Sequence, residues 1–171
     1  MLRSPNMKKQ KTHVVTYEAA HNRAVRQFKK MSMFILWSGV LNIVSAIVAV
    51  LRTGAMDFSL SYAFNEMLFR LLIEHTALSN VWLGISIVGI AAVSGIAFAV
   101  LGIFANMGNR LCLLLAAALY FIDFILIFIF IPYGESYWTM IVVHIMFMFA
   151  AFAAVVTYYQ VLAIEKKFHK V

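Results

Sequence analysis

The sequence predicts an all-α, polytopic integral membrane protein: four transmembrane helices in an antiparallel bundle, with an amphipathic helix at the outer interface. Three observations support this fold class. Hydrophobic residues make up 64% of the 171-residue chain and charged residues only 12%, which is far from the balance of a soluble domain. Four apolar stretches are each long enough to span a bilayer. The basic residues gather on one predicted side of the membrane.

The predicted spans cover residues 31–51, 81–107, 111–131 and 137–164. A spanning helix needs about 20 predominantly apolar residues at a rise of about 1.5 Å each, and all four stretches reach that length. The second and fourth are long enough to tilt or to extend beyond the hydrocarbon. Residues 1–30 form a basic N-terminal segment that we expect to be partly helical, and residues 165–171 form a basic tail.

Lysine and arginine set the expected orientation, because positively charged flanks are retained on the cytoplasmic side. Of the 14 basic residues, only Arg52 and Arg70 lie in the loops that would face outward; the others lie in the two tails or in the turn between the second and third spans. We therefore expect a multi-pass protein of the plasma membrane with both termini cytoplasmic. This topology explains the net charge of +7, so no nucleic-acid partner is needed to account for it.

Residues 57–75, in the first outer loop, predict an amphipathic helix. Its apolar positions form one broad face, while Glu66, Arg70 and Glu74 follow one another at i, i+4 spacing on the other and can form pairs. The segment is too charged to span, so we expect it to lie in the outer interface or to dip partway into the bundle as a cap. It either only closes the loop or forms a lid over an outward-facing cavity, with Glu66, Arg70, Glu74 and His75 at the entrance.

Three polar residues lie at nearly one depth inside the predicted spans. Counted from the outer ends of their helices at ~1.5 Å per residue, Asp123 is ~12 Å deep, His144 ~10 Å and Asn42 ~14 Å. The third and fourth spans are antiparallel neighbours joined by a short turn, so a contact between Asp123 and His144 is expected. Ser45 shares the helix face of Asn42, and Tyr120 shares that of Asp123, so both belong to the candidate site.

This polar group has two main interpretations. An ionised carboxylate inside a bilayer costs at least about 2.5–3.5 kcal/mol unless it is paired, so Asp123 is a candidate for binding a cation or a small polar ligand. His144 beside it can hold or relay a proton. Alternatively, the polar side chains only join helices through hydrogen bonds. An intramembrane enzyme that uses Ser45, His144 and Asp123 has less support, because no glycine elbow or ordered motif surrounds the serine.

The sequence predicts no metal and no cofactor. Asp123 and His144 supply two ligands where a tetrahedral metal site needs three or four, and the chain contains no phosphate-binding or dinucleotide motif. Small residues recur along the second span, which favours close helix packing, self-association or docking of another membrane protein. This small-residue stripe consists of Gly84, Ala91, Gly95, Ala99 and Gly102.

Two functions from different classes follow from these patterns. The first is a small transport or ligand-binding protein in the lipid bilayer, whose polar site opens outward through a hydrated cavity. The second is a non-catalytic accessory or assembly subunit, in which the polar residues are a structural clasp and the small-residue stripe docks a partner. A cavity that reaches the polar residues favours the first function. A dry site with an exposed stripe favours the second.

Overall fold

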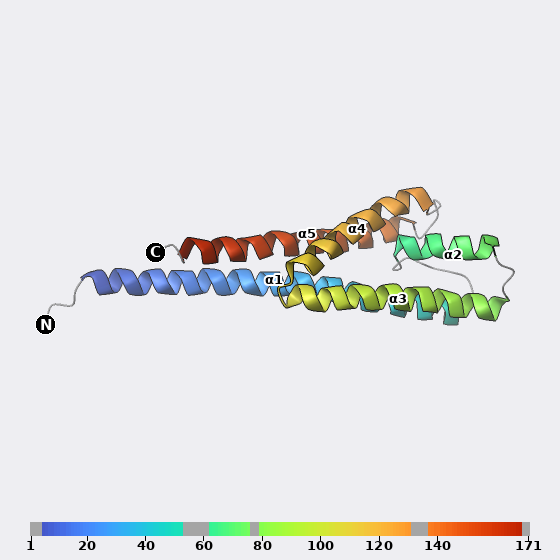
Figure 1. Ribbon diagram of the computed structural model, residues 1–171, viewed down its shortest axis with the longest axis horizontal. Helices are drawn as coiled ribbons and strands as arrows, with labels where there is room; N and C mark the ends of the chain where they lie inside the picture. Colours follow the sequence, from blue (N-terminus) through green and yellow to red (C-terminus); the bar gives the residue numbers. More distant parts are fainter. Residues whose placement is uncertain (1–4, 53–61, 76–78, 131–136, 169–171) are drawn as a thin grey trace.

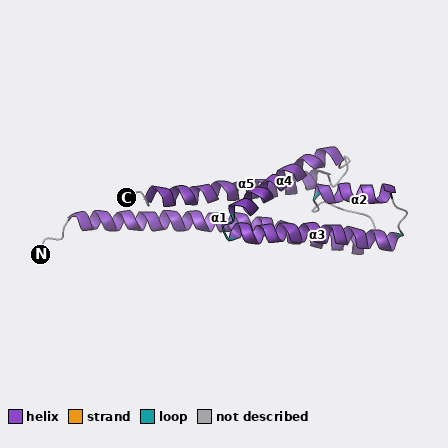
Figure 2. Cartoon of the chain, viewed as in Figure 1, coloured by secondary structure: helices purple, strands orange, loops and turns teal. Residues whose placement is uncertain are grey.

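The computed structural model is helical throughout the residues that it describes, which are 5–52, 62–75, 79–130 and 137–168, apart from short connections (Figure 2). Its helices in these ranges are α1 (Pro5–Arg52), α2 (Ala63–His75), α3 (Asn80–Asn106), α4 (Arg110–Phe130) and α5 (Tyr137–Phe168). All except α2 are long and apolar enough to cross a membrane. The predicted fold class is therefore confirmed: the chain is a four-span helical membrane protein.

The first helix is a single rod of 48 residues, so the basic N-terminal segment continues without a break into the first span. Pro5 occupies its first position, where the missing N–H group costs nothing. No glycine or proline follows until Gly39. At about 1.5 Å per residue the helix is about 72 Å long, against about 30 Å for the hydrocarbon of a bilayer. Its N-terminal part must therefore extend outside the membrane.

Both chain ends lie at the same end of the molecule, and α1 and α5 extend beyond the turn that joins α3 to α4 (Figure 1). Asn106 fixes the level of that turn, because its Nδ2 donates to the Lys29 carbonyl oxygen (3.0 Å) and to the Ser32 hydroxyl (2.8 Å). Arg110 lies nearby with its guanidinium 5.5 Å from the centre of the Tyr159 ring. The parts of α1 and α5 beyond this level form a two-helix stalk.

Contacts between α1 and α5 hold the stalk together. His21 Nε2 lies 3.0 Å from Glu165 Oε1, and the rings of Tyr17 and Phe168 are 4.6 Å apart. The exposed surface of the stalk is rich in basic side chains, which are Arg23, Arg26, Lys29, Lys30, Lys166 and Lys167. The stalk thus carries much of the positive charge that sets the predicted orientation.

Glycines bring α1 and α3 into close contact. A Cβ atom on Gly39 would clash with the Gly95 carbonyl oxygen, and one on Gly95 would lie 2.5 Å from the Gly39 carbonyl oxygen. One on Gly102 would lie 2.5 Å from the backbone nitrogen of Leu36. Small residues permit such close approach of helix backbones in membranes. The small-residue stripe of α3 therefore faces α1 of the same chain and is not an exposed docking surface.

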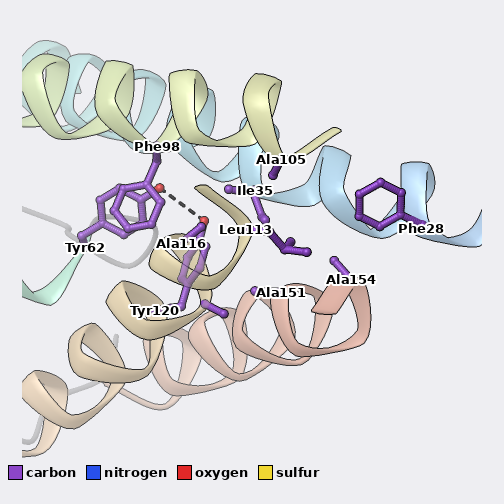
Figure 3. Close-up of a cluster of buried hydrophobic side chains, with 11 residues drawn as sticks. Phe28, Ile35, Tyr62, Phe98, Ala105, Leu113, Ala116, Tyr120, Ala151 and Ala154 are labelled. Carbon is purple, nitrogen blue, oxygen red and sulfur yellow. Dashed lines mark hydrogen bonds between the residues drawn. The ribbon is translucent and has the colours of Figure 1, made fainter. Parts of the chain in front are cut away.

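The centre of the bundle is filled by aromatic and small side chains (Figure 3). Phe98 of α3 lies with its ring 4.8 Å from that of Tyr120 of α4, and Tyr62, directly before α2, lies 4.4 Å from Phe98. Ala116 and Ala151 are fully buried on α4 and α5, where the two helices pack against each other. The three aromatic rings thus fill the space between α3, α4 and the start of α2.

The short helix α2 contacts α3 and α4 in the half of the bundle away from the chain ends (Figure 1). Ala63 and Asn65 at its start are buried, whereas Ile73, Glu74 and His75 at its end are exposed. Its N-terminal end therefore dips into the bundle as a cap, which is one of the two placements that its sequence allows. Residues 57–61 of the predicted helix lie outside the described residues.

We expect Gly95→Ala to destabilise the bundle, because the new methyl group would meet the Gly39 carbonyl oxygen and the Ile43 side chain at 2.5 Å. Overpacking of this kind costs about 1–3 kcal/mol. Gly89→Ala is the matched control on the same helix, since nothing lies within 4 Å of its added methyl group. Thermal unfolding in detergent, followed by circular dichroism, should show a lower Tm for Gly95→Ala alone. Equal Tm values for the two variants would contradict the close contact.

Candidate functional site

Buried polar side chains from every described helix converge on the N-terminal end of α2. Each is at most 5% exposed, although all lie among apolar helices. The group comprises Ser38 and Asn42 of α1, Asn65 of α2, Ser94 of α3, Asp123 of α4 and His144 of α5. Together with Tyr62 and Tyr120, whose hydroxyls join them, these residues form what we call the polar cluster.

Asn42 connects three parts of the chain. Its Nδ2 donates to the Ala91 carbonyl oxygen and to Ser94 Oγ, both at 2.9 Å. Its Oδ1 accepts from the backbone N–H of Tyr62 (3.1 Å) and from Nδ2 of Asn65 (3.0 Å). A primary amide has two N–H donors and two acceptor lone pairs, which these four bonds match. Asn42 therefore fixes α1 to α3 and to the start of α2 at the same time.

Asp123 caps α2 from a neighbouring helix. Its Oδ1 accepts a hydrogen bond from the backbone N–H of Phe64 (3.1 Å), which lies in the first turn of α2. The first N–H groups of a helix have no partner within the helix, and their end of the helix carries a partial positive charge that favours an anion. The cap thus satisfies a part-buried donor at the start of α2.

The second carboxylate oxygen of Asp123, Oδ2, lies 3.0 Å from Nε2 of His144, so the contact expected from the sequence is present. His144 Nδ1 is 2.8 Å from the Met140 carbonyl oxygen, which can only accept, so Nδ1 carries a hydrogen. Oδ2 and Nε2 have no other hydrogen-bond partner among the described residues. They would repel each other if neither were protonated, so this contact requires one proton. With that proton the pair has no net charge, which suits a bilayer interior.

A short chain of hydroxyl groups links α1 to α4. Ser38 Oγ donates to the Ile35 carbonyl oxygen (2.8 Å) and therefore accepts from the Tyr62 hydroxyl, 2.9 Å away. The Tyr62 and Tyr120 hydroxyls are 3.4 Å apart (Figure 3). Burial raises the pKa of the Tyr62 hydroxyl well above its ordinary value, so the group stays neutral. These hydroxyls act as hydrogen-bond partners and not as charges.

The predicted site residues lie in three places. Asn42, Tyr120, Asp123 and His144 lie in the polar cluster, whereas Ser45 is half-buried on α1 and forms none of the hydrogen bonds described for the cluster. The expected entrance residues lie on α2. Arg70 is half-buried, Glu74 and His75 are exposed at the end of the helix farthest from the cluster, and the Glu66 side chain lies outside the described residues.

Sequence reasoning missed Tyr62, Asn65 and Ser94. Asn65 directly follows Phe64 on the predicted amphipathic helix, and Ser94 is a polar residue beside Gly95 in the middle of a span. Each is a polar residue in apolar surroundings, which is a signal that could have identified it. The role of Tyr62 rests partly on its backbone N–H, which no side-chain pattern reveals. Within the described ranges, no group of three or more His, Cys, Asp or Glu side chains is arranged to hold a metal ion.

Fold and site together define a four-span membrane protein with a buried polar hydrogen-bond network. Comparison of the chain with protein-family models, with curated proteins and with solved structures finds no match. Function is therefore inferred from the geometry of the polar cluster.

We expect Asn42→Ala to lower the free energy of unfolding by about 2 kcal/mol, since it removes the four hydrogen bonds described above, each worth about 0.6 kcal/mol inside a membrane protein. Ser45→Ala, one turn further along α1, should have little effect. Unfolding of the reconstituted protein in increasing denaturing detergent measures both changes. Faster amide hydrogen exchange at residues 62–65 in Asn42→Ala would locate the loss at the start of α2. Equal destabilisation by the two variants would argue against Asn42 as a central connection.

Proposed function

We propose that this protein is a small transport or ion-binding protein that takes up and releases a proton, or a cation in its place, at Asp123 and His144. One observation supports this proposal: the two oxygens of the Asp123 carboxylate contact different groups. Oδ2 contacts His144, and Oδ1 caps α2. The protonation state of the pair and the position of α2 are therefore coupled through one side chain.

The direction of the coupling follows from electrostatics. With one proton in the Asp123–His144 contact, a charge-separated pair presents a carboxylate to the N-terminal end of α2, where helix dipole and N–H groups favour it. A second proton neutralises the carboxylate, leaves a cationic His144 and weakens the cap. Proton uptake therefore loosens α2, and proton release restores it. A cation that neutralised the carboxylate would act in the same way.

The helix α2 suits the role of a gate. Its N-terminal end covers the polar cluster, and its other end is exposed, so in this proposal a displacement of α2 along its axis uncovers Asp123. Half-length helices whose N-terminal ends point at an anionic group occur at the ion and substrate sites of transporters. In this proposal both termini are cytoplasmic, the protein lies in the plasma membrane, and α2 covers the site from outside.

The alternative function is a non-catalytic accessory or assembly subunit in which the polar cluster only fixes the helices. The matched hydrogen bonding of Asn42 and the burial of the cluster favour this role for the α1 side of the site. The small-residue stripe cannot be its docking surface, because Gly95 and Gly102 pack against α1. Such a subunit would have to bind its partner through another face.

Asp123→Asn tests the proposal most directly, because asparagine keeps an oxygen for the Phe64 N–H group but cannot exchange a proton. In reconstituted wild-type protein we expect an infrared carboxyl band that titrates with pH, and proton uptake into vesicles driven by a membrane potential. Asp123→Asn should lose the band and the uptake while retaining its helical circular dichroism. Glu18→Gln, which removes an exposed carboxylate from the stalk part of α1, is the control and should retain both.

His144→Ala separates the two functions. If the site exchanges protons, this variant should shift the titration of the carboxyl band and reduce uptake. If neither the wild type nor the variants show a titrating band or any uptake of protons or alkali cations, and the substitutions at Asp123 and His144 only lower Tm, the proposal is wrong. The polar cluster would then be the clasp of an accessory subunit.

A further inference from the structure

A wide apolar groove runs along the side of the bundle between α1 and α5, away from the polar cluster. Its volume is about 810 Å³, and its walls include Phe34 and Trp37 of α1 with Met146 and Phe149 of α5. Trp37 is 53% exposed, Met146 62% and Phe149 65%, so the groove opens sideways. Cavities that hold small ligands occupy about 300–1,000 Å³. The groove is therefore large enough for part of a lipid.

One end of the groove is charged. Lys30 lines it on α1, and the α1 residues of the wall continue from there to Leu41, about 16 Å further along the helix axis. Within the described ranges Lys30 has no acidic partner, and Arg26, one turn earlier on the helix, adds a second exposed positive charge. The groove thus begins at the basic level of the stalk and continues beside apolar side chains into the span.

We propose that this groove binds an anionic phospholipid from the leaflet on the side of the chain ends, with an acyl chain along the apolar walls and the lipid phosphate at Lys30. The walls would accept the acyl chain of any phospholipid, so Lys30 is the group that selects the negative headgroup. Basic sites between membrane helices on the cytoplasmic side recognise anionic headgroups in this way. This inference is independent of the proton site, because the groove shares no residue with the polar cluster.

Trp37 provides the readout, since its ring lies in the wall of the groove. The test uses the full chain with Trp82→Phe and Trp138→Phe, which leaves Trp37 as the single tryptophan. This protein is reconstituted in phosphatidylcholine vesicles that contain a brominated lipid, which is either phosphatidylglycerol or phosphatidylcholine. Bromine on the acyl chain quenches the fluorescence of nearby tryptophan. We expect Trp37 quenching to reach half of its maximum at a fraction of brominated phosphatidylglycerol about fivefold lower than that of brominated phosphatidylcholine. One basic side chain near a headgroup predicts a difference of this size.

Two substitutions separate charge from shape. Lys30→Gln should remove the preference for the anionic lipid, while Lys29→Gln, at an exposed neighbouring lysine that does not line the groove, should keep it. Ala153→Leu, in the wall on α5, should reduce quenching by both lipids because it fills the groove. Helical circular dichroism checks the folding of each variant.

Equal quenching by the two brominated lipids in the parent protein would overturn the proposal, as would a preference that survives in Lys30→Gln. Weak quenching by both lipids, together with chemical cross-linking of the protein to itself through this face, would show that a second copy covers the groove, and would also overturn it.

Discussion

The centre of this protein depends on how the N-terminal end of α2 is capped by other helices. Two backbone N–H groups, of Tyr62 and Phe64, enter the bundle and donate to Asn42 and Asp123. No water is available inside a bilayer to replace such partners. Asn42 is in position because the glycine contact holds α1 against α3, and Asp123 is in position because α4 packs on α5. The remaining contacts of the polar cluster follow from these two caps.

The carboxylate of Asp123 stabilises the bundle and, in the proposed function, also exchanges a proton. A group that only had to join helices could be a neutral amide, as Asn42 is, at a lower cost in the bilayer. Asp123 instead combines a helix cap with a histidine contact that requires a proton. In the proposed function, protonation of the Asp123 cap changes the position of α2, whereas the amide cap of Asn42 has no proton to exchange. In this proposal, only the Asp123 side of the site responds to protonation.

The bundle separates its polar and apolar surfaces. The polar cluster is enclosed among α1, α3, α4, α5 and the start of α2, while the groove beside Lys30 opens at the side of the bundle. Basic side chains gather on the stalk, beyond the spans. The proposed lipid site and the proposed proton site therefore share no residue.

The sequence by itself determined the four spans, the common side of both termini, and the similar depth of Asp123 and His144 on neighbouring helices. Apolar length, a rise fixed by helix geometry and a short connecting turn leave little freedom in these features. Only the tertiary structure decided that the small-residue stripe of α3 faces α1, that His21 pairs with Glu165, and that α2 enters the bundle with its N-terminal end first. Counting along a helix gives the depth of a residue. Such counting does not show which neighbouring helix the residue contacts. It also does not show where a helix too short to span the membrane lies. Packing against all the other helices sets both of these features.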